Sequence, residues 1–116
     1  VIYACKYHMA KDHWQIVNNR EGEVAQEGGF ECVEIEQVNK KVLAVALKLC
    51  RYIGNGLYGV DLKEKDGEVY VIEVNDNPSI EAGVEDGILG ERLYEIIMER
   101  FLEMCMDKRK TYEKNI

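Results

Sequence analysis

The sequence predicts an α+β fold with a mostly antiparallel sheet and helices on one face. Two observations support this class. The expected strands follow one another in runs joined by hairpins, and they do not alternate strictly with helices. An Asp66-Gly67 pair between two alternating apolar segments is also typical of a β-hairpin. The 116 residues, 47% hydrophobic and 32% charged, fit one soluble domain with a single core.

The first third of the chain is expected to be mainly extended. Alternating side chains predict a strand over residues 1–9, and a second strand over 14–17. Polar residues over 18–29, ending in a glycine pair, indicate a loop. Residues 30–38 alternate apolar side chains with glutamates, which predicts a further half-exposed strand or extended segment.

A helix and a hairpin are expected next. Apolar residues at helical spacing predict a helix that Asn39 caps and Gly54 ends. Two strands over 57–64 and 68–75 then flank the turn. Residues 75–79 have the composition of a loop.

A final helix carries apolar residues at spacings of three and four between Leu89 and Met104. The last residues are mostly polar, so we expect a fraying tail over 108–116 and a domain over 1–107. The chain begins at Val1 and lacks an initiator Met, from which we expect a piece of a longer protein.

Charge and cysteine content limit the functional class. Fifteen basic and 22 acidic residues give a net charge of −7, which disfavours a general nucleic-acid binder but suits a metal site. No apolar segment is long enough to span a membrane, and the first residues lack a targeting pattern, so we expect a cytoplasmic protein. The cysteines show no C-x-x-C pair and are expected to be free, buried thiols. They are Cys5, Cys32, Cys50 and Cys105.

Three oxygen-bearing side chains on the hairpin suit Mg²⁺, which prefers hard oxygen ligands. Strict alternation places Glu73 and Asn75 on one side of the second strand, together with Val69 and Val71. Asp61 lies on the first strand between two apolar residues. The alternative is that these acidic residues only form a solvated strand face.

The turn decides whether Asp61 joins this group. A two-residue turn pairs Lys65 with Glu68 and points Asp61 away from Glu73. A three-residue loop, with Gly67 in a left-handed bulge, pairs Glu64 with Glu68 and brings Asp61 to the Glu73 side. The metal interpretation therefore requires the three-residue loop.

These residues resemble a known family. Gly59-Val60-Asp61-Leu62, followed by Val71-Ile72-Glu73-Val74-Asn75-Asp76-Asn77-Pro78, is similar to the ATP-grasp superfamily. More narrowly, it resembles the RimK-like carboxylate–amine ligases, which include an enzyme that adds glutamates to a ribosomal protein. Weaker similarity extends upstream, over residues 4–10, 13–16 and 28–30.

The resemblance implies the C-terminal subdomain of an ATP-grasp fold. In that family, residues matching Asp61, Glu73 and Asn75 bind the Mg²⁺, or alternatively Mn²⁺, that bridges the ATP phosphates. Lys6 is the candidate catalytic and phosphate-binding residue, and Asn18 is a further phosphate or metal neighbour.

The implied reaction phosphorylates a substrate carboxylate with ATP and joins the acyl phosphate to an amine. A protein or peptide substrate follows by analogy only, and oligomerisation stays open. Neither a nucleic acid nor a membrane is an expected partner. The chain alone is expected to be inactive, because the family's other ATP-gripping subdomain is not in this sequence. The alternative is a non-catalytic ATP-grasp-like binding or regulatory module.

Overall fold

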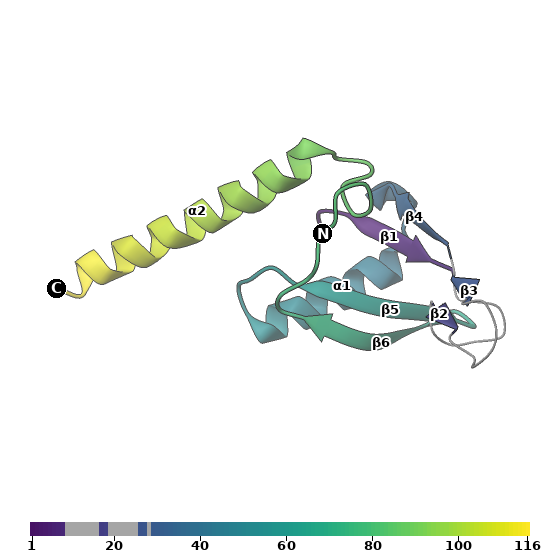
Figure 1. Ribbon diagram of the computed structural model, residues 1–116. Coiled ribbons are helices and arrows are strands. Elements are labelled where there is room, and N and C mark those ends of the chain that lie inside the picture. Colours follow the sequence, from purple (N-terminus) through teal and green to yellow (C-terminus); the bar gives the residue numbers. More distant parts are fainter. Residues whose placement is uncertain (9–16, 19–25, 28) are drawn as a thin grey trace.

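The computed structural model describes residues 1–8, 17–18, 26–27 and 29–116. Over these ranges the chain forms three two-stranded antiparallel sheets and two α-helices, so the predicted α+β class is confirmed (Figure 1). The sheets pair β1 with β4, β2 with β3, and β5 with β6. In order, the elements are β1 (Ala4–Tyr7), β2 (Val17–Asn18), β3 (Gln26–Glu27), β4 (Phe30–Val33), a 3-10 helix (Ile35–Gln37), α1 (Lys40–Ile53), β5 (Gly59–Lys65), β6 (Glu68–Asn75) and α2 (Glu91–Lys114).

The early strands are shorter than predicted. β1 covers four residues of the expected 1–9, and the strand predicted over 30–38 ends at Val33, where a 3-10 helix replaces it. Within the expected loop, β2 pairs with β3. Most of the strand predicted over 14–17 lies outside the described residues. Short two-stranded ladders of this kind depend on packing against neighbours, which an alternation pattern does not report.

The first helix begins and ends as predicted. The Asn39 side chain accepts a hydrogen bond from the Lys41 backbone N–H at 2.9 Å, which caps the first turn. At the other end, Gly54 has φ +133° and donates its N–H to the Cys50 carbonyl at 3.0 Å. Asn39 also donates to Glu64 of β5, so the cap joins α1 to the hairpin.

The hairpin turn differs from the one that the metal interpretation required. Lys65 pairs with Glu68, and both central residues have positive φ, 53° at Asp66 and 77° at Gly67. This is the two-residue turn whose backbone twist matches the twist of the strands. Of the two turns left open by the sequence, the two-residue turn is the observed one, and the three-residue loop that the metal interpretation required does not form.

The described part of the chain has a small core, located at the start of α2. Leu93 is fully buried and Ile97 is 8% exposed, and they are its only buried hydrophobic residues. The rest of α2 extends beside the body, and the molecule measures 64 × 30 × 29 Å (Figure 1). Neither described helix is both long and apolar enough to cross a membrane.

The last helix is longer than predicted. α2 continues through the polar residues 108–114 that were expected to fray. Lysine, arginine and glutamate are good helix formers, and an Arg109–Glu113 ion pair at 3.1 Å supports the final turns. Thr111 also donates its hydroxyl to the Asp107 carbonyl at 3.0 Å.

Candidate functional site

A β-bulge determines which residues of the hairpin face each other. Leu62 pairs with Val71, but the next residue of β5, Asp61, pairs with Glu73. Ile72 is the extra residue of β6 at this irregularity. The two-residue turn alone would have pointed Asp61 away from Glu73. One added residue reverses the side of the strand on which the following side chains lie, so the bulge brings Glu73 to the same side as Asp61. Asp61 and Glu73 therefore lie directly opposite each other.

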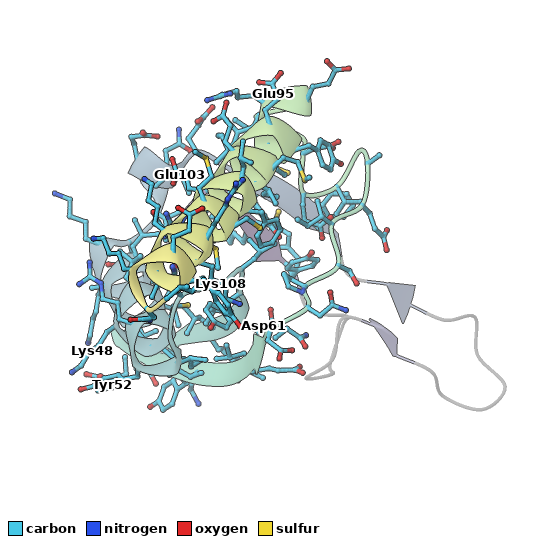
Figure 2. The ribbon with its side chains drawn as sticks, turned by 90° about the vertical axis from the view of Figure 1, so that its left-hand side faces the viewer. Lys48, Tyr52, Asp61, Glu95, Glu103 and Lys108 are labelled. Carbon is cyan, nitrogen blue, oxygen red and sulfur yellow. The ribbon has the colours of Figure 1, made fainter. Side chains whose placement is uncertain are left out.

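The bulge also changes the predicted composition of each face. Asn75 pairs with Gly59 and lies two residues beyond Glu73, so Asp61, Glu73 and Asn75 share one face. Val69 and Val71 do not belong to that face as predicted, because they precede the bulge. The other face of the hairpin lies next to α1. Its half-buried residues are Val60, Leu62, Val69 and Val74. Figure 2 accordingly shows Asp61 well apart from Lys48 and Tyr52 of α1.

A tight contact fixes the end of this face. A Cβ added to Gly59 would lie 2.9 Å from the Cβ of Pro78 and 3.9 Å from the Cβ of Asn75. The loop after β6 therefore folds back across the start of β5, and only a glycine admits it at this distance. This contact links the Gly-Val-Asp segment to the Asn-x-x-Pro segment.

The electrostatic environment between β1 and the hairpin is negative. Burial raises the pKa of Tyr3, and the charges of Glu85, Cys5 and Asp61 raise it further. Tyr7 has its pKa raised to about 12 by burial first, and then by Glu85, Cys5, Tyr3 and Asp61. Both phenols therefore stay neutral at physiological pH. Asp61 and Glu85 therefore both place negative charge near these two phenols.

The carboxylate pair has no basic partner within the described residues. Every ion pair formed there involves other carboxylates, as Lys41–Glu68 at 3.2 Å and Arg92–Glu95 at 2.9 Å illustrate. Nor do three His, Cys, Asp or Glu side chains converge in this part of the structure as a ready-made metal cage. Asp61 and Glu73 supply two carboxylates and Asn75 an amide oxygen, so a bound Mg²⁺ would take its other ligands from water or phosphate.

The two other predicted site residues lie apart from this face or are only partly described. Lys6 is exposed and pairs with Glu31, on the side of β1 that also carries His8. Asp61 acts on Tyr3, which lies just before β1, and on Tyr7 of β1, and Lys6 alternates to the opposite side from them. Asn18 lies in β2 opposite Gln26, and its side chain is outside the described part of the chain.

The cysteines are free, as predicted, but none of the four is buried. Cys105 is exposed and the other three are half-buried. Cys5 and Cys32 face each other across β1 and β4 with their sulfur atoms 3.7 Å apart, and Cys32 donates to the Val84 carbonyl at 2.7 Å. Burial and Cys32 raise the pKa of Cys5 to about 12, so its thiol is protonated at neutral pH.

Sequence reasoning missed three contributors to this region: the Ile72 bulge, the tyrosines Tyr3 and Tyr7, and Glu85. The bulge leaves one signal in the sequence. Val69 and Val74 are the half-buried residues of β6 and are five positions apart. In a regular strand, residues an odd number apart point to opposite sides, so a bulge between them is needed to bury both on one side. Tyr3 and Glu85 lie far from the hairpin in sequence and carry no such signal.

Comparison with known proteins gives one match. The sequence pattern of the ATP-grasp domain matches residues 9–81, which include Asp61, Glu73 and Asn75 but not Lys6. No curated protein and no solved structure matches this chain. Because the match covers more than half of the sequence, the chain belongs to the ATP-grasp family, whose members are generally ATP-dependent ligases that bind ATP and usually a divalent metal.

Proposed function

We propose that this chain is the metal- and nucleotide-binding portion of a RimK-like, ATP-dependent carboxylate–amine ligase. In this proposal Asp61, Glu73 and Asn75 hold Mg²⁺, or Mn²⁺ in its place, against the ATP phosphates. The carboxylate and the amine are small molecules or groups of a protein or peptide. The reaction forms an acyl phosphate and ADP, and attack by the amine then releases phosphate.

One observation supports the proposal most strongly. The bulge holds two carboxylates directly opposite each other on an exposed face, and neither forms an ion pair with a basic side chain of the described residues, although Lys63 lies two residues away on the same side of β5. Like charges placed opposite each other on antiparallel strands are destabilising. A divalent cation between them would convert this repulsion into attraction. A bulge that creates such a pair is better explained by a ligand than by stability.

The chemistry suits the donor set. Phosphoryl transfer needs charge neutralisation and positioning more than a covalent nucleophile. A bound Mg²⁺ would neutralise charge on the phosphate oxygens. Asp61 and Glu73 would fix its position on rigid strands, while the Gly59–Pro78 contact holds Asn75 at the strand end. No serine or cysteine is needed for this reaction, and the chain has one serine, Ser79.

Lys6 and Asn18 are assigned to the phosphates by resemblance alone. The exposed position of Lys6, on the side of β1 away from Asp61, favours the alternative of a module that binds Mg·ATP without transferring phosphate. A catalytic role for Lys6 predicts that Lys6→Ala reduces turnover of the complete enzyme and leaves its metal affinity unchanged.

Calorimetric titration of the chain with ATP, with and without Mg²⁺, tests the proposal. We expect binding that depends on Mg²⁺ and weakens at least tenfold in Asp61→Asn and in Glu73→Gln. The control is Asp66→Asn, which removes the same charge from the far end of the same hairpin, about 17 Å away along β5. If Asp61→Asn binds Mg·ATP as well as Asp66→Asn does, the assignment is wrong.

A further inference from the structure

The long helix α2 presents two apolar faces, and only one of them packs on the body. Leu93 and Ile97 are buried, and Arg100 on the same side donates to Asn55 at 2.9 Å. The second face is open to solvent. It carries Met98, 64% exposed, and Tyr112, 77% exposed.

The exposed face follows a heptad pattern. Its residues are separated by alternating steps of four and three, which is the spacing of core positions in a coiled coil. This seam consists of Tyr94, Met98, Phe101, Cys105, Lys108 and Tyr112. Lys108 can lay its aliphatic stem along the seam, and a single polar core residue fixes register at some cost in stability. A fully solvated helix has no physical need for this spacing.

Charge is divided along α2. Residues 91–107 contain five acidic and two basic side chains, whereas residues 108–114 contain four basic and one acidic. Figure 2 shows Glu95 and Glu103 on the first part of the helix and Lys108 on the last part. Two such helices side by side repel each other when parallel. When antiparallel, each acidic part lies against a basic part, and the helix dipoles are opposed.

We propose that α2 is a self-association surface that pairs antiparallel with α2 of a second copy of this chain. The seam is self-complementary about its middle, near Glu103. It places Tyr94 against Tyr112 of the partner subunit and Phe101 against Cys105 of the partner subunit. Met98 then lies against Lys108 of the partner subunit. Glu95 and Arg109, next to the seam on the same side, approach each other between the copies.

The geometry permits this pairing. The molecule measures 64 × 30 × 29 Å with α2 included, and most of α2 extends past the strands, so its exposed face can meet another helix along its length (Figure 1). The seam from Tyr94 to Tyr112 is about 27 Å long, at a rise of about 1.5 Å per residue. A single helix pair of this length buries less than a standard interface, so we expect a weak dimer that dissociates on dilution. The inference is independent of nucleotide binding.

Sedimentation velocity of the 116-residue chain tests the surface. Between about 1 and 100 µM we expect a concentration-dependent shift from monomer to dimer. The double variant Met98→Glu with Phe101→Glu should stay monomeric. The matched control is Met106→Glu, which puts the same charge on an exposed methionine outside the seam and should dimerise as the wild type does. A wild-type chain that stays monomeric up to about 100 µM would overturn the proposal.

Charge reversal tests the orientation and guards against misfolded seam variants. One variant makes all of α2 acidic through Lys108→Glu, Arg109→Glu and Lys110→Glu. The other makes it basic through Glu91→Lys, Glu95→Lys and Glu99→Lys. Each should dimerise at least tenfold more weakly than the wild type, and an equimolar mixture should restore a heterodimer. Circular dichroism confirms that each variant keeps α2. If the acidic variant dimerises like the wild type, or the mixture fails to associate, the antiparallel pairing is wrong.

Discussion

Gly59 is the position where one methyl group tests how the candidate site is built. Its added Cβ in Gly59→Ala would meet the Cβ of Pro78 at 2.9 Å. Ordinary carbon–carbon contact is about 3.5–4.0 Å, so one side must move by close to 1 Å. The proline ring cannot rotate away from the contact. The backbone that follows Asn75 therefore has to shift.

The cost follows from that geometry. Overpacking of this kind destabilises a protein by about 1–3 kcal/mol. Replacing a strand glycine by alanine stabilises it by about 0.5–1 kcal/mol, because the unfolded chain loses conformational freedom. We expect Gly59→Ala to lower the free energy of unfolding by about 1–2 kcal/mol, measured by urea denaturation. Because Asn75 lies directly opposite Gly59, divalent-ion affinity should fall in the same variant.

Gly29 provides the matched control. A Cβ added there meets nothing within 4 Å, and its backbone has no positive φ. Gly29→Ala should leave stability unchanged or raise it by up to about 1 kcal/mol through the unfolded state. If Gly59→Ala is as stable as Gly29→Ala, the Pro78 contact does not constrain the strand end and this reasoning fails.

Two further predictions concern the framework around the site. Asn39→Ala removes the N-cap of α1 and the hydrogen bond to Glu64, so chemical denaturation should show a free energy of unfolding lower by about 1–2 kcal/mol. Asn39→Ser keeps the cap and should lose less stability. Equal losses in the two variants would argue against capping. The raised pKa of Cys5 means that the folded state holds its proton, so the stability it contributes is present below pH 9 and is lost as the pH rises toward about 12. Alkylation of Cys5, followed by peptide mapping, should accelerate near pH 9 in urea but only near pH 12 in the folded chain. Equal pH profiles in the two states would contradict the assignment.

Local signals in the sequence predicted the second half of the fold well. The Asn39 cap, the Gly54 end and the Asp66-Gly67 turn each depend on a few neighbouring residues with strong conformational preferences. The extent of α2 was underestimated, since polarity was taken as a sign of fraying. The ion pair between Arg109 and Glu113 shows that a polar segment can still be a good helix.

The candidate site was only partly predictable, since its assembly depends on tertiary structure. Residue types indicated Asp61, Glu73 and Asn75, but they gave no means of choosing the strand register. The three-residue loop, which the metal interpretation was thought to require, does not form, and the bulge at Ile72 brings the carboxylates together instead. Contacts distant in sequence, such as Glu85 near β1, need the folded chain to be seen.

The central claim is that the Asp61–Glu73 pair exists for a divalent cation. The most direct measurement is thermal unfolding of the wild type, Asp61→Asn, Glu73→Gln and the control Asp66→Asn, in EDTA and in Mn²⁺. In EDTA the two site variants should be more stable than the wild type by about 0.2–1 kcal/mol, because the repulsion is relieved. In Mn²⁺ at about one hundred times the wild-type Kd, the wild type and Asp66→Asn should gain about 2.7 kcal/mol, and the site variants, with an affinity at least tenfold weaker, at most about 1.4 kcal/mol. Equal stabilisation of all four proteins by Mn²⁺ would contradict the account.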